Sequence, residues 1–339
     1  MQTAGLTDLQ VNGYAGVDFN DAGLDAPALD HALAAMLRAG VTTCLPTIIT
    51  ATENELAARL QALDRAVANS RLGPLMVPGF HLEGPFLNPA DGYAGCHPRS
   101  AMVPPDPDML GRLTALLARP VLLLTLAPER DGAGATIAWA RSRGMLVAIG
   151  HSAAEDADVT QAADAGATLS THLGNGLPRM LPKFHNPLMA QLAEDRLAAS
   201  FIADGIHIPV PALKVLLRAK GPERSVLVTD ATAAAAAPPG VYRFAGMAIE
   251  HATDGSVRVP GQAVLAGSAL CLDQAMRNLV EWGIADAAQA VRLASDNPAA
   301  LLAPALAAHG LRPGHATLTW SADLRPVSVR LADREIVLR

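Results

Sequence analysis

Cysteine is scarce in this sequence of 339 residues. The three cysteines, Cys44, Cys96 and Cys271, lie far apart in the chain and are odd in number. Small disulfide-stabilised domains and zinc sites made of closely spaced cysteine pairs both require more cysteines at shorter spacings. The sequence therefore excludes a disulfide framework and a CxxC metal site as the basis of the fold.

Long apolar runs and clusters of basic residues are missing as well. The chain has no apolar stretch of about 18 residues, and its N-terminus lacks the basic-then-apolar pattern of a secretory signal. Charged residues make up 17% of the sequence, and the formal net charge is −6. Proteins that bind nucleic acid or anionic membranes need concentrated positive charge. We therefore expect a cytoplasmic protein whose partner is neither nucleic acid nor a membrane.

Short apolar runs that alternate with helical segments are abundant. Continuous runs of this length are typical of parallel strands that are buried on both faces. The runs that indicate strands are 6–11, 41–46, 76–82, 121–126, 146–151, 168–172, 198–203 and 225–229. The helical segments between them are 27–39, 53–68, 108–118, 136–143, 155–165, 186–194 and 211–219. Eight strands alternating with helices predict an α/β fold of the (β/α)₈ barrel, or TIM-like, type.

The sequence pattern changes after the eighth strand. Residues 241–259 alternate apolar and polar side chains around Asp254-Gly255, which predicts a β-hairpin. Two helices, 269–282 and 285–302, and three short strands within 316–338 are expected to follow. We assign residues 1–310 to the barrel, including a hairpin insertion near 238–262. Residues 311–339 are assigned to a small, reduced β-sandwich subdomain that packs on the barrel.

Two histidines end consecutive predicted strands. His151 follows the run from Leu146, and His172 follows the next run, with a helix closed by Gly166 between them. In parallel α/β folds, sites are built where the strands have their carboxyl ends. One such histidine alone would more often be a packing or capping residue. Two at equivalent positions favour a metal site, because imidazole is the commonest neutral metal ligand.

Other polar side chains also lie at or just after the strand ends. They are Gln10, Asn12, Glu83, His207 and Asp230. One carboxylate and two imidazoles leave an open coordination position, which is typical of a catalytic metal site. A divalent cation would polarise a carbonyl oxygen and lower the pKa of water. A second carboxylate nearby could then accept a proton and pass it to a leaving amine.

Asp230 is the strand-end acid that remains for this proton transfer when Glu83 is a metal ligand. Its alternative role is that of a helix N-cap after strand eight. His81, two residues before Glu83, is expected to be a packing residue that points away from it. His185 lies beyond strand six and could reach substrate, although a surface position is the other interpretation.

Nearly the whole chain resembles the N-acetylglucosamine-6-phosphate deacetylase family of the amidohydrolase superfamily. The resemblance lies in the shared order and spacing of several short motifs, each of which is weak by itself. They are Asp8-Leu9-Gln10-Val11-Asn12-Gly13, His81-Leu82-Glu83-Gly84-Pro85-Phe86, Gly150-His151-Ser152, Thr171-His172-Leu173, Ala203-Asp204-Gly205-Ile206-His207, Val228-Thr229-Asp230-Ala231, Leu265-Ala266-Gly267-Ser268-Ala269-Leu270 and Asn297-Pro298-Ala299.

The resemblance implies a role for each matching residue. Glu83, His151 and His172 match the metal ligands of the family, and Asp230 matches its catalytic acid/base. The residues that match substrate contacts are His97, His207 and Asn175.

The resemblance also bears on the number of metal ions and on the oligomer. Gln10 and Asn12 stand where many amidohydrolases carry His-x-His and bind two metals, and an amide is a poor ligand for a second zinc ion. One divalent ion is therefore expected, most simply Zn²⁺, although Fe²⁺, Co²⁺ and Ni²⁺ accept similar donors. A homodimer is implied as well.

Three features depart from the family pattern. Gly174 and Gly176-Leu177 stand where an aromatic residue and Ala-Met are usual, and Lys183 with Arg179 nearby stands where a phosphate-binding arginine is usual. A lysine binds phosphate as a point charge and not through a bidentate fork. The chain also begins almost at strand one, where the family has a preceding β-sandwich segment. Either the subdomain is reduced or the gene start is misplaced.

Two enzymatic functions and one non-catalytic role remain open at this point. The first is metal-dependent hydrolysis of the N-acetyl amide of an amino-sugar phosphate, N-acetylglucosamine 6-phosphate. The second is hydrolysis of another N-acyl sugar or small amide without phosphate, which the changed loop after His172 would allow. The third is a scaffold that has lost the reaction, against which the presence of Glu83, His151, His172 and Asp230 together argues.

Overall fold

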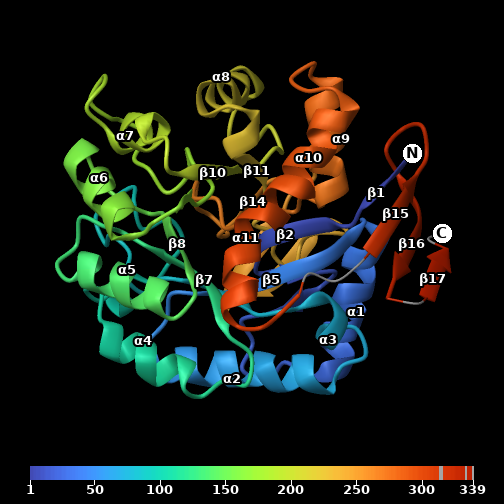
Figure 1. The fold of residues 1–339 in the computed structure, drawn as a ribbon, viewed down its shortest axis with the longest axis horizontal. Coiled ribbons are helices and arrows are strands. Elements are labelled where there is room, and N and C mark those ends of the chain that lie inside the picture. Colours follow the sequence, from blue (N-terminus) through green and yellow to red (C-terminus); the bar gives the residue numbers. More distant parts are fainter. Residues whose placement is uncertain (313–315, 333, 338–339) are drawn as a thin grey trace.

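The computed structural model describes residues 1–312, 316–332 and 334–337. Residues 313–315, 333 and 338–339 of the predicted C-terminal segment lie outside the described residues. Eight parallel strands form one sheet in the order β11-β10-β9-β8-β7-β6-β5-β2. Their bounds are β2 Leu6–Val11, β5 Val41–Ile49, β6 Phe80–Glu83, β7 Val121–Leu126, β8 Leu146–Ile149, β9 Leu169–Ser170, β10 Ala198–Phe201 and β11 Ser225–Leu227. The predicted barrel is confirmed (Figure 1).

The sheet closes where β2 meets the segment that follows β11. Val11 and Ala231 form an isolated parallel bridge, and Asp230 N donates to Gln10 O at 2.9 Å. Asn12 N donates to Ala231 O at 2.7 Å. We call this junction, residues 8–12 with 229–231, the closing seam. It joins the first and last strands of the barrel through few backbone bonds, so side chains also contribute to it.

Helices surround the barrel (Figure 1): α1, α2 and α4 to α8 lie in the connections between one parallel strand and the next, whereas α9 to α11 follow the last barrel strand. Most begin where the sequence offers a capping side chain: Thr52 and Glu55 form a capping box at the start of α2, and Asp25 caps α1. The helix bounds are α1 Ala26–Arg38, α2 Glu53–Asn69, α4 Pro107–Thr114, α5 Ala133–Ser142, α6 Asp156–Ala165, α7 Pro187–Ala193, α8 Val210–Lys220, α9 Leu272–Glu281, α10 Ala287–Ala294 and α11 Asp296–Ala308.

Two predicted elements have different bounds in the structure. The segment 76–82 was expected to be one strand, but Gly73–Met76 forms a short helix, α3, and the strand β6 begins at Phe80. A short apolar run does not by itself distinguish helix from strand, and Pro74 favours the start of a helix. The predicted helix 285–302 is two helices, because Ser295, with φ −125° and ψ −74°, leaves the helical conformation between α10 and α11.

Three small sheets lie outside the barrel. Strands β12 (Gly240–Phe244), β13 (Met247–His251) and β14 (Val257–Arg258) form the antiparallel insertion, and β3 (Gly13–Tyr14) pairs with β4 (Val17–Asp18). Strands β15 (Ala316–Trp320), β16 (Pro326–Leu331) and β17 (Arg334–Val337) form an antiparallel sheet. The N-terminal strand β1 (Gln2–Ala4) joins that sheet by pairing with β15 (Figure 1). The predicted domain boundaries stay a prediction.

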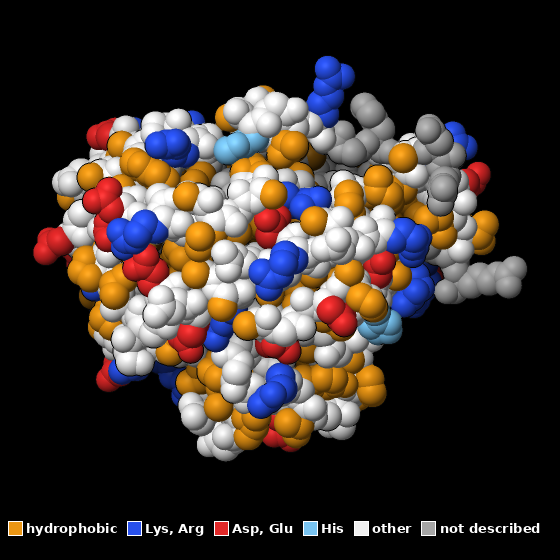
Figure 2. Space-filling view, turned by 90° about the horizontal axis from the view of Figure 1, so that it is seen from below, with side chains coloured by type: hydrophobic (Ala, Val, Ile, Leu, Met, Phe, Trp, Pro, Cys, Tyr) orange, Lys and Arg blue, Asp and Glu red, His pale blue; other side chains and the backbone are white. Residues whose placement is uncertain are grey.

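The described helices are too short or too polar to cross a bilayer. On the face that Figure 2 shows, Lys and Arg side chains are interspersed with Asp and Glu side chains. This mixed surface agrees with the absence of a basic cluster in the sequence.

Candidate active site

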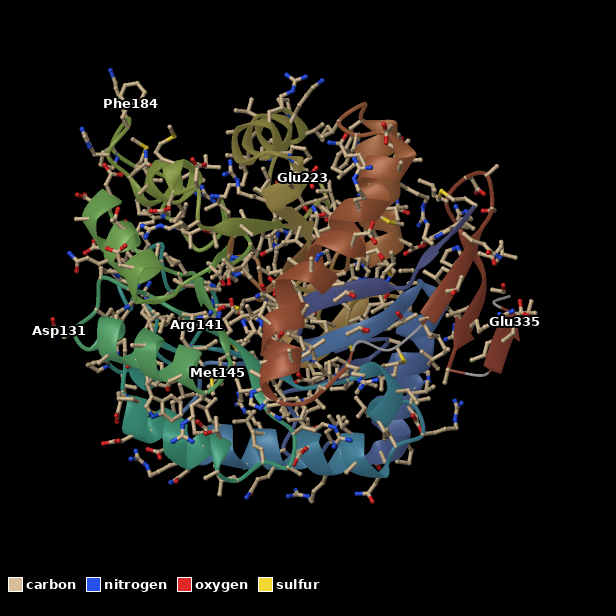
Figure 3. The ribbon with its side chains drawn as sticks, viewed as in Figure 1. Asp131, Arg141, Met145, Phe184, Glu223 and Glu335 are labelled. Carbon is tan, nitrogen blue, oxygen red and sulfur yellow. The ribbon has the colours of Figure 1, made fainter. Side chains whose placement is uncertain are left out.

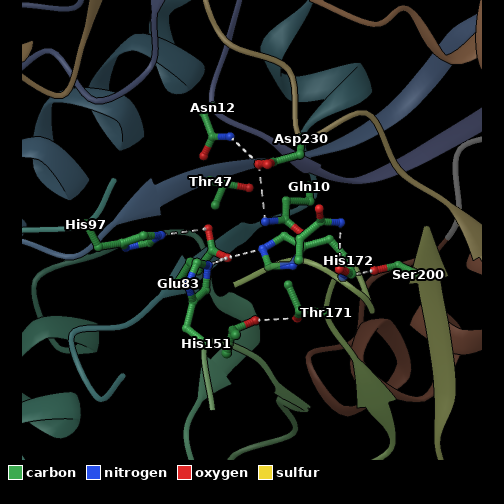
Figure 4. Close-up of polar contacts among 12 residues, drawn as sticks. Gln10, Asn12, Thr47, Glu83, His97, His151, Thr171, His172, Ser200 and Asp230 are labelled. Atoms are coloured by element: carbon green, nitrogen blue, oxygen red, sulfur yellow. Dashed lines mark hydrogen bonds and ion pairs between the residues drawn. The ribbon is translucent and has the colours of Figure 1, made fainter. Parts of the chain in front are cut away.

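Four chemistry-bearing residues meet at the mouth formed by the carboxyl ends of the barrel strands. Glu83 is the last residue of β6, and His151, His172 and Asp230 each follow the end of β8, β9 or β11 by two or three residues. Each is therefore placed by a strand that is buried in the core. The convergence that the sequence predicted for these positions is present in the structure (Figure 4).

Three imidazoles surround the carboxylate of Glu83. The Nε2 atoms of His172 and His151 lie 2.9 and 3.4 Å from Glu83 Oε1, and His97 Nε2 lies 3.8 Å from Oε2 (Figure 4). All four side chains are buried. The imidazole rings of His97 and His151 are 4.5 Å apart, and those of His151 and His172 are 5.0 Å apart. Four donor groups thus face one another in a space from which most water is excluded.

The backbone at three of these positions is left-handed. His151, His172 and Asp230 have φ values of 50°, 29° and 49°. Such values are uncommon for residues other than glycine and cost roughly 1–3 kcal/mol each, so they persist where surrounding contacts hold them. His172 N donates to Ser200 Oγ at 2.7 Å, and His151 O accepts from Asn88 N at 3.0 Å. The sharp turns aim the three side chains into the mouth.

Hydrogen bonds at Nδ1 leave Nε2 available on two of the histidines. His151 Nδ1 lies 2.7 Å from the backbone oxygen of Tyr93, which can only accept, so Nδ1 carries the proton. His97 Nδ1 lies 3.0 Å from Thr50 Oγ1. Second contacts of this kind fix ring orientation in metal-binding histidines. In the described part of the chain, the buried Nδ1 of His172 has no partner.

Charge and burial favour neutral imidazole beside an ionised carboxylate. Burial, followed by the neighbouring His151, lowers the pKa of His97 to about 3. Although burial alone would raise it, contacts with His151 and His172 hold the pKa of Glu83 well below its usual range. Burial opposes protonation of His172, but Glu83 more than compensates and raises the pKa of this imidazole. An ionised carboxylate beside imidazole lone pairs is the donor type that divalent transition metals bind.

The residues fit a divalent metal ion. One ligand atom each from Glu83, His97 and His151 lies within 4.8 Å of the other two, a spacing that could hold an ion. His97 was expected to be a substrate contact. In the structure it lies closer to the Glu83 carboxylate than the sequence indicated. His172, which was expected to be a ligand, contacts the other oxygen of the same carboxylate. The structure therefore offers two overlapping donor sets that share Glu83 and His151.

Asp230 lies across the mouth from the Glu83 cluster. Its Oδ1 accepts from Asn12 Nδ2 at 2.7 Å and from Gln10 Nε2 at 3.3 Å (Figure 4). Burial raises the pKa of the Asp230 carboxyl, and among the opposing effects the neighbouring His172 is the largest. A carboxyl with a raised pKa is suited to accepting and returning a proton. Gln10 and Asn12, predicted as strand-one contacts, thus hold the proposed acid/base.

A cavity of about 540 Å³ opens at this mouth. Besides the residues above, it is lined by three of the predicted substrate contacts, Asn175, Arg179 and His207. His207 Nδ1 lies 2.6 Å from Asp204 Oδ2, and Asn175 Nδ2 donates to His172 O at 3.0 Å. Lys183 is exposed in the loop between β9 and α7 and is not among the described residues that line the cavity. The geometry thus favours Arg179 over Lys183 as a contact within one chain.

The predicted orientation of His81 was wrong, whereas its predicted packing position is confirmed because the side chain has no exposed surface. Residues i and i+2 of a strand share a face, so His81 points to the same side as Glu83. Its Nε2 lies 2.8 Å from Thr125 Oγ1, which in turn lies 2.8 Å from Thr171 Oγ1, and its Nδ1 lies 3.2 Å from Thr47 Oγ1. Burial lowers the pKa of His81 to about 4. His81 therefore belongs to a buried polar layer of the barrel.

Three further residues near the site were missed by the sequence reasoning. Arg99 and Arg258 also line the cavity. Glu129 accepts from Ser152 Oγ at 2.6 Å and from Ala153 N at 2.7 Å, which fixes the chain directly after His151. Arg99 follows a loop without periodicity, and Arg258 ends β14, where the alternation over 241–259 separates two faces but does not indicate which face meets the barrel mouth. Glu129 gave no signal because its partners, which also include Asn88 Nδ2 at 2.8 Å, are uncharged groups from two other loops.

The chain was compared with known proteins to identify its family. No protein-family model matches the chain. An N-acetylgalactosamine-6-phosphate deacetylase of Escherichia coli O157:H7 is 35% identical over 91% of this chain and 79% of its own length. An N-acetylglucosamine-6-phosphate deacetylase of Bacillus subtilis is 30% identical over 98% of this chain and 81% of its own length.

A solved structure agrees with these relatives in fold. A mutant N-acetyl-D-glucosamine-6-phosphate deacetylase of Mycobacterium smegmatis, in complex with N-acetyl-D-glucosamine-6-phosphate, is 30% identical and superimposes with a TM-score of 0.88. The match covers 99% of this chain and 87% of the other. The resemblance noted in the sequence is thereby confirmed. This chain belongs to the N-acetylglucosamine-6-phosphate deacetylase family of the amidohydrolase superfamily.

Proposed function

We propose that this protein hydrolyses the N-acetyl amide of N-acetylglucosamine 6-phosphate to glucosamine 6-phosphate and acetate, with one divalent metal ion. The observation that carries the proposal is the placement of Asp230 opposite the Glu83 cluster in one cavity of about 540 Å³. Membership of a family of deacetylases supports the reaction class. The mutant enzyme of Mycobacterium smegmatis that binds this sugar phosphate supports the substrate.

Glu83, His151 and His172 would hold the metal. The two imidazole nitrogens approach the same carboxylate oxygen, at 3.4 and 2.9 Å, whereas His97 faces the other oxygen at 3.8 Å. His97 is accordingly assigned to the substrate. When bound, a divalent ion supplies a Lewis acid that polarises the amide carbonyl and makes water more acidic. Zn²⁺ suits this donor set, and Fe²⁺, Co²⁺ and Ni²⁺ are the alternatives.

Asp230 would move the proton. As a carboxylate it accepts a proton from the attacking water, and as an acid it returns that proton to the nitrogen of the departing amino sugar. Asn12 and Gln10 donate to Oδ1, which leaves Oδ2 for the water. Because these two side chains hold Asp230 and carry neutral amides, they are not assigned to a second metal ion.

His207, Asn175 and the cavity arginines would bind the sugar phosphate. Arg179 lies in the loop after His172, and the same cavity is lined by Arg99 from the short helical turn Arg99–Ala101 and by Arg258 from β14. Arg99 also pairs with Asp91 at 2.5 Å, so Arg179 and Arg258 are the better candidates for an anion. A guanidinium can hold two phosphate oxygens at once. Lys183 remains a candidate of the same loop.

N-acetylgalactosamine 6-phosphate is the second candidate substrate. The Escherichia coli relative at 35% identity is named for this sugar, which differs from the glucosamine compound in the configuration at one hydroxyl. The loop after His172 carries Gly174 and Gly176, both with positive φ, so its course in this chain depends on glycine. That loop borders the cavity and could accommodate either epimer.

A cytoplasmic homodimer completes the proposal. A phosphorylated sugar is charged and does not leave a cell by diffusion, which favours a cytoplasmic enzyme. The loop between β9 and α7 exposes Met180 and Phe184, at 87% and 74%, and Phe184 lies at the outer edge of the molecule (Figure 3). Exposed apolar side chains of this size favour contact with a second subunit. Sedimentation at several protein concentrations measures the oligomer.

The test of the function is a substrate panel on protein of known metal content. Release of acetate would be measured for N-acetylglucosamine and N-acetylgalactosamine, each with and without the 6-phosphate. We expect the highest kcat/KM for N-acetylglucosamine 6-phosphate and loss of activity after chelation. Equal rates for phosphorylated and unphosphorylated sugars would favour an N-acyl hydrolase without phosphate specificity. No activity on any of the four by metal-loaded protein would reject the proposal.

A further inference from the structure

A buried carboxylate of the closing seam plays no part in the chemistry described so far. Asp8 lies in β2 and has no exposed surface. Its hydrogen-bond donors in the described structure are Thr229 and Gln10, its charged neighbour is the acidic Asp230, and no salt bridge among the described residues includes it. A buried charge without a counterion is costly unless hydrogen bonds satisfy it. The partners of Asp8 therefore indicate what the residue does.

The donors to Asp8 come from both sides of the seam. Thr229 gives two of them: its Oγ1 donates to Asp8 Oδ2 at 2.6 Å, and its N donates to Oδ1 at 3.2 Å. Gln10 N donates to Oδ1 at 3.3 Å from the same strand. In its ionised form Asp8 accepts at both oxygens. An asparagine would present an N–H group either to the backbone donors or to Thr229 Oγ1, whose proton would then have to turn to Gln10 O at 3.3 Å, so part of the arrangement would be lost.

Thr229 links the hydrogen bonds of Asp8 to the backbone around Asp230. Its Oγ1 accepts from Ala231 N at 3.1 Å, so one hydroxyl connects Asp8 to the residue on the far side of Asp230. Ser268 holds the same turn from another direction, since its Oγ donates to Thr229 O at 2.6 Å and its N donates to Asp230 O at 2.9 Å. The left-handed conformation of Asp230, with φ 49°, lies at the centre of these contacts.

The geometry points to Asp8, acting through Thr229, as a positioning residue for Asp230. Asp8 is not among the described residues that line the cavity, so it acts through the chain that carries the acid/base and not on the substrate. Three constraints act on the Asp230 carboxylate: Asn12 and Gln10 hold Oδ1, and the Asp8–Thr229 pair holds the backbone. This inference rests on the proposed role of Asp230.

The pair can be tested with isosteric variants. Asp8→Asn removes one acceptor, Thr229→Val removes the hydroxyl, and Thr229→Ser keeps it. We expect Asp8→Asn and Thr229→Val to lower kcat about 10- to 100-fold, the order of loss from misplacing a catalytic group by up to 1 Å. KM and metal content should stay close to those of the wild type. Thr229→Ser should keep kcat within about 3-fold because the hydroxyl still bridges Asp8 and Ala231.

A double-mutant cycle separates positioning from general stabilisation. In an Asp230→Asn background residue 230 has no carboxylate left to position. Adding Asp8→Asn should therefore lower kcat by less than about 3-fold. Ser295→Ala is the matched control, since this buried serine donates to Gly5 O at 2.9 Å near the start of β2. It should lower stability and leave kcat unchanged.

The outcomes distinguish this inference from the proposed function. Asp8→Asn at the wild-type kcat, or an equal loss of kcat with and without Asp230→Asn, would overturn the positioning role while leaving the deacetylase intact. A kcat loss in Ser295→Ala as large as in Asp8→Asn would also overturn it. If Asp230→Asn itself retained the wild-type rate, the assignment of the acid/base would fail first.

Discussion

A separate prediction about metal content follows for each of the three histidines around Glu83. His151→Asn and His172→Asn should each lose bound metal and nearly all activity, because each removes one of three proposed protein ligands. His97→Asn should keep the metal and raise KM, since His97 faces the other carboxylate oxygen. Metal per protein is measured by elemental analysis after dialysis. Full occupancy in His172→Asn with loss in His97→Asn would exchange the roles of the two histidines.

The proposed role of the Asp230 carboxyl leads to a prediction about kcat. Asp230→Asn should keep the metal and lose about 10²- to 10⁴-fold in kcat, the usual contribution of general acid–base catalysis. The amide has nearly the same shape and cannot take up the proton. Asn12→Ala, which removes the 2.7 Å hydrogen bond to Oδ1, should have a smaller effect. Steady-state kinetics on metal-matched samples measures both, and a wild-type rate in Asp230→Asn would leave this residue a capping role.

The burial of the Asp8 carboxyl leads to a prediction about how the stability of the protein depends on pH. Burial raises the pKa of Asp8 from 3.8 to about 7, and the hydrogen bonds from Thr229 offset only part of this shift. The folded protein therefore binds this proton more tightly than the unfolded chain. The stabilising contribution is complete below about pH 4 and is lost as the pH rises through 7.

Urea unfolding between pH 4 and pH 8 measures this contribution. The unfolding free energy of Asp8→Asn should fall less with rising pH than that of the wild type, by on the order of 1.4 kcal/mol for each unit of pKa shift. The variant should then be slower at pH 8 without being much less stable. Parallel stability curves for the two proteins would show that Asp8 titrates near its ordinary value.

Of the elements, the loop between β9 and α7 is the one that we propose recognises the substrate phosphate. Arg179 lines the cavity and Lys183 does not, so Arg179→Ala should raise KM for a phosphorylated sugar about 10- to 150-fold, as expected from losing a charge-assisted hydrogen bond. KM for the unphosphorylated sugar should not change. Lys183→Ala is the matched loop variant and should have the smaller effect. The idea fails if Arg179→Ala with Lys183→Ala leaves the preference for phosphate intact.

The barrel strands and helices could be predicted from sequence because each follows a local rule. Strands such as β7 are continuous apolar runs buried on both faces, and helices such as α2 begin at a capping residue. The segment from Gly73 to Phe80 could not be predicted in the same way, since its apolar residues fit a helix or a strand equally well. Strand β1 was missed because three residues carry no periodicity.

The positions of Glu83, His151, His172 and Asp230 followed from the strand ends, whereas their contacts did not. The approach of His97 to Glu83 depends on the loop that brings Tyr93 over His151, and sequence spacing contains no information on that path. The error at His81 was different in kind. The alternation of strand side chains was sufficient to place it on the same side as Glu83.

At the scale of the whole molecule, metal binding should stabilise the fold. The proposed ligands come from β6 and from the turns after β8 and β9, so an ion would connect three parts of the barrel. Ligand binding at about 100 times Kd adds roughly 2.7 kcal/mol. Chelation should therefore lower the unfolding temperature by several degrees and Zn²⁺ should restore it, in thermal melts followed by circular dichroism. Glu83→Gln should melt at the same temperature with and without Zn²⁺, and a Zn²⁺ response in this variant would place the ion elsewhere.

The pairing of β1 with β15 bears on how the chain folds during synthesis. Trp320 Nε1 donates to Thr3 Oγ1 across 317 residues of sequence. At a translation rate of about 5–20 residues per second, the first strand waits roughly 16–60 s for its partner to leave the ribosome. The closing seam, which includes Asp8 and Thr229, also cannot form for most of that time. A nascent chain thus carries an unpaired edge at β1 until β15 has emerged, and a chaperone that covers this edge during that interval would protect it.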